Sequence, residues 1–133
     1  MEHHSNLVPW QELASKKGAI LKLVGLDSDY KLDLSQFSSE ISDRTRLVAI
    51  THMSNVLGTI TPIKEITTAA HKVGAKVLVD AAQSVGKIPV DINEMKIDLL
   101  SISGHKIYGP KGVGALYKRH KVQLQPIMLG GGH

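Results

Sequence analysis

Short apolar runs alternate with stretches of helical periodicity along this chain. Each run has the length and the Val, Ile and Leu content of a strand that is covered on both faces. Strands that alternate with helices form mainly parallel sheets, so the pattern predicts an α/β domain with helices on both faces of the sheet. The last strand is expected to pair antiparallel with a neighbour. The predicted strands are 19–26, 46–51, 76–79, 98–102 and 114–117.

Two segments carry the start and stop signals of helices. The first begins near Pro9 and ends at Gly18, a residue type that commonly closes a helix. The second begins at Thr61-Pro62, where the threonine hydroxyl is the expected N-cap and the proline lies in the first turn. Gly74 closes this second helix. Its predicted apolar face consists of Ile63, Ile66, Ala70 and Val73.

Composition places this pattern in a globular protein of one-domain size. The 133 residues are 42% hydrophobic and 21% charged. No apolar run reaches the roughly 18–20 residues of a membrane-spanning helix, so no membrane association is expected. His3 and His4 stand where a signal peptide would carry Lys or Arg, so a cytoplasmic location is expected. Cysteine is absent from these residues, which excludes disulfides, thiolate metal sites and a cysteine nucleophile within them.

The basic excess does not indicate a nucleic-acid binder. The chain has 16 basic and 12 acidic residues, a formal charge of +4. The only dense basic cluster is 118–121 (KRHK), directly after a predicted strand. Aromatic residues amount to 4%, too few for a base-stacking platform. We therefore interpret the cluster as a solvated basic turn and expect no nucleic acid among the partners.

Polar side chains follow three of the predicted strands. Because the carboxyl ends of parallel strands open on one edge of a sheet, the three loops are expected to face a common ligand site. They are His52-Met53-Ser54-Asn55, Asp80-Ala81-Ala82-Gln83 and Ser103-Gly104-His105-Lys106.

Each of these residues also has an ordinary structural explanation. An aspartate or asparagine at a strand end often caps a turn, a lysine in a loop is usually solvated, and His105 can be a structural histidine. The glycines of 109–114 (GPKGVG) match neither common phosphate-loop spacing. We interpret them as a tight turn that enters the last strand, and a generic nucleotide-binding domain is disfavoured for the same reason.

Taken together, the residue types suit pyridoxal 5'-phosphate (PLP). This cofactor needs a lysine for a Schiff base and a carboxylate at its pyridine nitrogen. It also gains from a flat ring stacked on it and from donors to its phenolic oxygen and phosphate. The candidates are Lys106 for the Schiff base, Asp80 for the nitrogen, Gln83 and Asn55 for the ring oxygen, Ser103 and His105 for the phosphate, and His3 or His4 for stacking.

The sequence around these residues resembles the cysteine desulfurases, within the class V aminotransferase group of PLP enzymes. The stretch VLVDAAQSVGK…DLLSISGHKIYGPKGVGALY carries the resemblance, which extends over essentially all 133 residues. It implies the large domain of PLP-dependent transferase fold type I. It also implies that Lys106 and His3 are catalytic, with Lys106 shuttling the substrate α-proton and His3 stacking on the ring. In the same way, Asp80, Gln83, Ser103, His105 and Asn55 are implied to bind the cofactor, with Asn55 close to the substrate.

Two features of the resemblance leave the subgroup open. The segments EHHSNLVPWQ and ITHMSNVLGTITPI resemble the cysteine desulfurase/selenocysteine lyase branch. The turn GPKGVGALY and the ending MLGGGH resemble the branch that supplies sulfur for general iron–sulfur cluster assembly. Selenocysteine lyase and other class V activities, such as aminotransfer or kynurenine cleavage, are the alternatives with the same cofactor.

Members of this family are longer than 133 residues, which shapes the remaining expectations. They carry an upstream phosphate-binding turn and a downstream small domain with a substrate-binding arginine and a sulfur-accepting cysteine. Residues 1–133 are therefore expected to be the central part of the PLP-binding large domain, without the small C-terminal domain. The resemblance implies conversion of L-cysteine to L-alanine, a sulfur-acceptor protein and a homodimeric parent. An inactive fragment is the non-enzymatic alternative.

Overall fold

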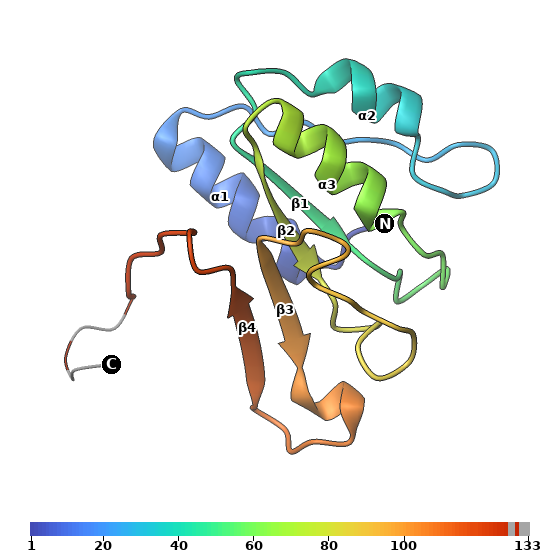
Figure 1. The fold of residues 1–133 in the computed structure, drawn as a ribbon, viewed down its shortest axis with the longest axis vertical. Coiled ribbons are helices and arrows are strands. Elements are labelled where there is room, and N and C mark those ends of the chain that lie inside the picture. The colour runs from blue at the N-terminus through green and yellow to red at the C-terminus, as the bar shows by residue number, and fades with distance from the viewer. Residues whose placement is uncertain (128–129, 131–133) are drawn as a thin grey trace.

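The computed structural model describes residues 1–127 and 130 of the chain. Most of the ending MLGGGH, which entered the subgroup comparison, lies outside the described residues. Four strands form one sheet in the order β1-β2-β3-β4 (Figure 1). The elements are η1 (His4–Asn6), α1 (Val8–Lys17), α2 (Leu34–Glu40), β1 (Leu47–Thr51), α3 (Ile63–Lys72), β2 (Lys76–Asp80), β3 (Leu99–Ser103), η2 (Gly104–Ile107) and β4 (Gly114–Lys118).

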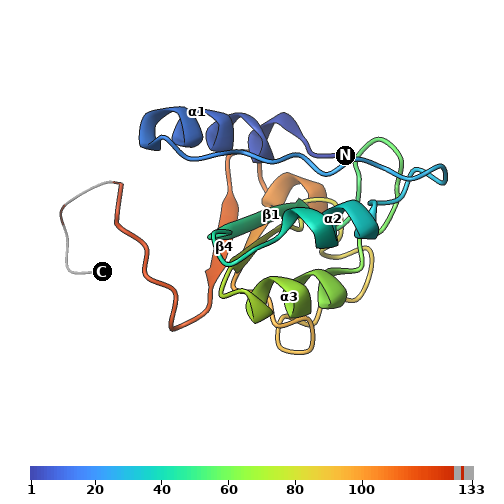
Figure 2. The ribbon, with the colours of Figure 1, turned by 90° about the horizontal axis from the view of Figure 1, so that it is seen from above.

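The sheet is mainly parallel and has helices on both faces, as the alternation of strands and helices predicted. Strands β1, β2 and β3 run parallel, and β4 pairs antiparallel with β3. Figure 2 shows α1 on one side of the sheet and α3 on the other. The predicted α/β fold class is therefore confirmed. Within the described residues, the connection from β2 to β3 contains turns rather than a helix.

The core lies between α3 and the sheet. Ile63, Ile66 and Ala70 of α3 are buried, as their spacing predicted, and they belong to the same cluster as Val77 and Val79 of β2. The apolar periodicity thus identifies the contact that supports the middle strand. On the other face, α1 ends at Gly18 in the left-handed conformation, as predicted, but none of its residues is buried.

The predicted strand 19–26 is wrong. This segment forms no strand, and its only ladder contact is an isolated antiparallel bridge between Leu26 and Leu32. Ile20 and Leu23 are 76% and 63% exposed. An apolar run becomes a strand only when a neighbouring strand pairs with it, and here the run passes along the outside of the sheet without a partner.

The predicted threonine N-cap of α3 is also wrong. The helix begins one position later, with Pro62 as its N-cap and no side-chain capping bond. The Thr61 backbone N–H donates to the His52 carbonyl at 2.9 Å, while its side-chain oxygen is buried and has no partner in the part of the chain that the structure describes. Thr61 therefore belongs to a short backbone pairing with the segment after β1 rather than to the helix end.

The basic cluster 118–121 is only partly solvated. Lys118, His120 and Lys121 are exposed, but Arg119 is half-buried. Its guanidinium donates to the carbonyls of Ile97 and Ile92, each at 3.0 Å. Arg119 therefore ties the end of β4 to the turn before β3. No helix within the described residues is long and apolar enough to cross a membrane.

Candidate functional site

A cavity of about 530 Å³ opens at the carboxyl ends of β1, β2 and β3. The last residue of each of these strands, Thr51, Asp80 and Ser103, lines it. This is the edge where a parallel sheet is expected to present its ligand site. All seven residues in the predicted site line the cavity: His3, Asn55, Asp80, Gln83, Ser103, His105 and Lys106. His4, the alternative stacking residue, is not among the lining residues.

Asp80 presents a carboxylate at the end of the middle strand. It is 9% exposed, and its backbone lies in register between Thr51 of β1 and Ser101 of β3. Oδ1 accepts a hydrogen bond from the Ala82 backbone at 2.9 Å and a long one from the Ser101 hydroxyl at 3.5 Å. Within residues 1–127 and 130, no cation pairs with this carboxylate and no hydrogen bond ends on Oδ2. That oxygen is available to a positively charged ligand group.

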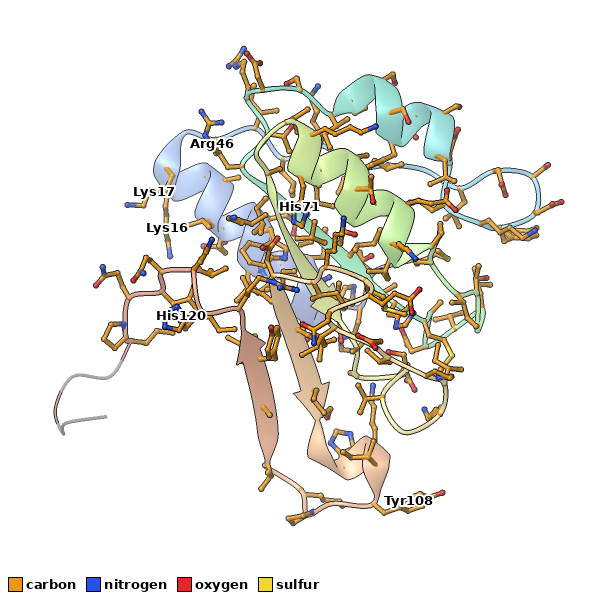
Figure 3. All side chains as sticks on the ribbon, viewed as in Figure 1. Lys16, Lys17, Arg46, His71, Tyr108 and His120 are labelled. Atoms are coloured by element: carbon orange, nitrogen blue, oxygen red, sulfur yellow. The ribbon has the colours of Figure 1, made fainter. Side chains whose placement is uncertain are left out.

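Lys106 lies on the short helix η2 directly after β3. The preceding Gly104 donates its N–H to the Val113 carbonyl at 2.9 Å, and a Cβ at position 104 would lie 2.7 Å from that oxygen. Glycine is therefore required for β3 to turn into η2 at this point. Lys106 is half-buried, and its amine makes neither a hydrogen bond nor an ion pair within the described part of the chain. Tyr108, two residues later, is fully exposed and projects away from the sheet (Figure 3).

Two further pairs order the polar side chains of the cavity. The Ser103 hydroxyl lies 3.0 Å from Nδ1 of His105, so the two predicted phosphate ligands are already in contact. Oε1 of Gln83 accepts a hydrogen bond from the Lys87 amine at 2.6 Å. Since a lysine only donates, this bond leaves the Gln83 amide nitrogen as a free donor. The Lys87 contact was not foreseen from the sequence, although the spacing of four residues could have suggested it.

His3 and Asn55 come from two loops outside the strands, and both are exposed. His3 is the N-cap of η1, where its Nδ1 accepts from the Ser5 backbone at 3.2 Å and lies 2.8 Å from the Ser5 hydroxyl. Asn55 follows β1 in a turn whose backbone N–H groups at Val56 and Leu57 donate to the Ser54 hydroxyl. The structure thus brings both loops to the cavity that the strand ends form.

Sequence reasoning missed three residues near the N-terminus, one of them in α1. Asn6 and Trp10 line the cavity, and Glu2 is hydrogen-bonded to Asn6. Burial raises the pKa of Glu2 above its usual range and the charge of Asp80 adds to the rise, while hydrogen bonds from Thr51 and Asn6 oppose it. The available signal was the spacing of four residues from Glu2 to Asn6 and from Asn6 to Trp10, which places side chains on one side of a helical turn.

His52 lies just behind the cavity, after the last residue of β1. It is buried, and its Nδ1 has no hydrogen-bond partner among the described residues. Burial lowers the pKa of His52 below its usual value. Its backbone N–H donates to the Asp80 carbonyl at 2.9 Å, so the backbone of this residue is joined to the strand end that presents the carboxylate.

The Aminotransferase class-V family model matches residues 1–133, the whole chain. The chain belongs to the class V aminotransferase family. Its relatives in that family include the cysteine desulfurase of Dickeya dadantii (strain 3937), which is 49% identical over 133 residues. This alignment covers 99% of the chain and 32% of the relative, so the chain spans about a third of that protein's length.

Solved structures of the family share the fold described above. The apo cysteine desulfurase from Thermococcus onnurineus NA1 is 44% identical, with a TM-score of 0.85 over 90% of this chain and 30% of that one. The structure of SspA in complex with cysteine is 39% identical, with a TM-score of 0.87 over 98% of this chain and 38% of that one. The resemblance to cysteine desulfurases stated from the sequence is therefore confirmed.

Proposed function

We propose that this chain is the cofactor-binding part of a PLP-dependent cysteine desulfurase, which converts L-cysteine to L-alanine and passes the sulfur to an acceptor. One observation carries the proposal: Lys106 and Asp80 stand at the ends of adjacent strands and line one cavity together with five further predicted ligands. Chemically different groups that are far apart in sequence meet there in the combination that PLP requires. The cysteine desulfurase relatives support the choice of reaction.

The donor set of the cavity fits the cofactor. Asp80 has a carboxylate oxygen free to hold the protonated pyridine nitrogen, and Gln83 has a free amide donor for the phenolic oxygen. Ser103 and His105 form a pair of polar side chains suited to the phosphate. When bound, PLP supplies an electron sink for negative charge that develops on the substrate α-carbon.

Lys106 has two tasks in this proposal. Its amine attaches the cofactor, and later it accepts the α-proton of the substrate at Nζ. The half-buried position limits the water around this amine, and no carboxylate among the described residues pairs with it. We propose that this unpaired amine acts as the nucleophile towards the cofactor and as the base towards the substrate.

The sulfur-accepting thiol must come from outside these residues, because they contain no cysteine. We propose that residues 1–133 correspond to the central part of the large domain of a homodimeric enzyme, and that an acceptor protein takes the sulfur for iron–sulfur cluster assembly. The SspA structure, which holds cysteine, supports L-cysteine as the substrate.

The test is covalent cofactor binding that depends on Lys106. The purified protein is titrated with PLP, its visible absorption is recorded, and the complex is reduced with borohydride and digested to locate the label. We expect a reducible yellow band and a label on Lys106. Lys106→Ala should lose both, whereas Lys111→Ala, a matched change in the exposed turn before β4, should retain both.

Three results would contradict the proposal. These are a flat spectrum from the wild-type protein, a label on another lysine, and an undiminished band in Lys106→Ala. Because the sulfur-accepting thiol lies outside residues 1–133, the reaction itself is tested on the full-length parent protein, by comparing its turnover of cysteine, selenocysteine and amino-acid/keto-acid pairs. Faster turnover of selenocysteine or of an aminotransfer pair would replace desulfuration with that activity.

A further inference from the structure

A row of side-chain hydrogen bonds links the N-terminal turn to the end of β1. The Thr51 backbone N–H donates to Oε1 of Glu2 at 2.9 Å, and Nδ2 of Asn6 donates to Oε2 of Glu2 at 2.6 Å. The Trp10 indole N–H then donates to Oδ1 of Asn6 at 3.0 Å. In both views the N-terminal segment starts close to the carboxyl end of β1 (Figures 1 and 2).

The donors at the two ends of this row determine which groups can stand between them. A backbone N–H and an indole N–H only donate, so each needs an acceptor facing it. The Asn6 amide has one acceptor and one donor, and its acceptor serves Trp10. The group at position 2 must therefore accept on both sides, which an ionised carboxylate does and an amide does not.

The same row holds His3 in place. The His3 carbonyl accepts from the Asn6 backbone N–H at 2.8 Å, and the His3 ring is bonded to Ser5 within the same turn. Asn6 is only 6% exposed, so its side chain has little room to find other partners. The turn places His3 at the cavity wall, so a change that displaces Asn6 also displaces His3 from its position there.

We propose that Glu2 is a positioning residue that sets the place of the His3 ring over the bound cofactor. This inference rests on the proposed function, in which His3 stacks on PLP. Glu2 does not line the cavity and acts through the turn 3–6. Glu2 acts by geometry: its two carboxylate oxygens are the acceptors that join this turn to the end of β1.

The order of donors and acceptors allows a charge-conserving test. Glu2→Gln places an amide nitrogen beside the Asn6 side chain. If the Asn6 amide keeps its orientation, its Nδ2 faces the new nitrogen; if it flips, its Nδ2 faces the Trp10 indole N–H. Two donors meet in either case. Asn6→Asp places two carboxylates against each other. The double variant Glu2→Gln/Asn6→Asp restores a complete order. Its new amide at position 2 accepts from Thr51 and donates to the new carboxylate at position 6, which also accepts from Trp10. Glu12→Gln, the same change at an exposed position of α1, is the matched control.

The first readout needs no cofactor. Trp10 is the only tryptophan of the sequence, so its indole N–H gives a single, unambiguous NMR signal. We expect this signal to shift and to exchange faster with solvent in Glu2→Gln. The double variant should return it towards the wild-type position. Far-UV circular dichroism and thermal unfolding are recorded alongside, so that a variant that fails to fold is recognised.

The second readout is the bound cofactor itself. Each single variant leaves one mismatched pair in the row, two donors in Glu2→Gln and two carboxylates in Asn6→Asp, and is expected to raise the Kd for PLP by about tenfold. The double variant should recover most of this loss. The visible circular dichroism band of bound PLP should change with it, because it reports the ring packed on the cofactor. In a His3→Ala background, Glu2→Gln should have no further effect on that band.

The outcomes separate this inference from the proposed function. If wild-type protein forms no reducible PLP adduct, the proposed function fails, while the indole signal still tests the hydrogen-bonded row. If wild type binds PLP but Glu2→Gln behaves like Glu12→Gln, the inference is wrong. It is equally wrong if the double variant is no better than the single variants, or if Glu2→Gln changes the cofactor band as much without His3 as with it.

Discussion

Asp80 and Ser103 are held at the cavity by the backbone ladder of the sheet, whereas the turn that carries His3 is joined to the sheet through the side chains of Glu2 and Asn6. Asp80 lies in register with Thr51 and Ser101, and Ser103 is in register with Gly114. A ladder position does not depend on the identity of any one side chain, because the bonds belong to the backbone. The N-terminal turn depends on a row in which one wrong donor disturbs every member. The comparison predicts different sensitivities to substitution.

The largest effect is expected where the ladder itself is supported. Ile66 of α3 is fully buried against the sheet, so Ile66→Ala should lower the free energy of unfolding by about 2–5 kcal/mol. Leu13→Ala on α1, where the side chain is 46% exposed, should cost no more than about 0.5 kcal/mol. Urea denaturation measures both. Equal losses from the two variants would show that α1 supports the fold as strongly as α3 does.

The next effect separates binding from stability at a ladder position. Asp80→Asn keeps the shape of the side chain and the place of the backbone but removes the negative charge. Losing one partner of a buried charge pair is expected to cost about 3 kcal/mol, which is roughly a hundredfold rise in the Kd for PLP. Thermal unfolding without PLP should stay close to wild type. Asp29→Asn, an exposed change in the loop before α2, is the control for both measurements. An unchanged Kd would remove Asp80 from the proposed site.

The smallest effect concerns pH and the buried ring beside the ladder. Burial holds the pKa of His52 below its unfolded value of 6.5, so the folded state binds fewer protons than the unfolded state. The stabilisation is therefore complete above pH 6.5 and is lost as the pH falls through the folded pKa. We expect the wild-type protein to lose more stability than His52→Gln between about pH 7 and about pH 5 in urea denaturation.

Glu2 also has a shifted pKa, so the pH dependence of stability must be compared between the wild type and His52→Gln rather than measured on the wild type alone. Its raised pKa has the opposite sign, since its contribution is complete below the unfolded value of 4.5 and is lost as the pH rises through the folded pKa. Glu2 is present in both proteins, so the difference between them isolates His52. Identical pH profiles for the wild type and His52→Gln would contradict the prediction.

Much of the site was predictable because it follows from the sheet. The runs at 46–51, 76–79 and 98–102 contain the residues of β1, β2 and β3 apart from the last residue of β2 and of β3, and the helix before β2 supports a parallel pairing. Polar residues that follow parallel strands are brought together whatever their separation in sequence. For this reason Asp80 and Lys106 meet at one cavity as predicted.

The wrong predictions share a dependence on partners that are distant in sequence. The run 19–26 has strand composition but no neighbouring strand, and Thr61 has an N-cap residue type but a backbone pairing that starts at His52. In both cases the local signal was present. For Thr61, the backbone pairing with His52 overrode the helix-capping signal. For 19–26, no strand pairs with the run among the described residues.

The sequence by itself determined the alternation of strands and helices, the strand ends that carry polar groups, and the resemblance to the cysteine desulfurases. These features depend on residue type and on spacing along the chain, which can be read without coordinates. Only the tertiary structure decided that Glu2 joins the His3 turn to Thr51, and that α1 lies on one side of the sheet with none of its own residues buried. These depend on which atoms meet in space, because Glu2 and Thr51 are 49 residues apart and only the fold brings them into contact.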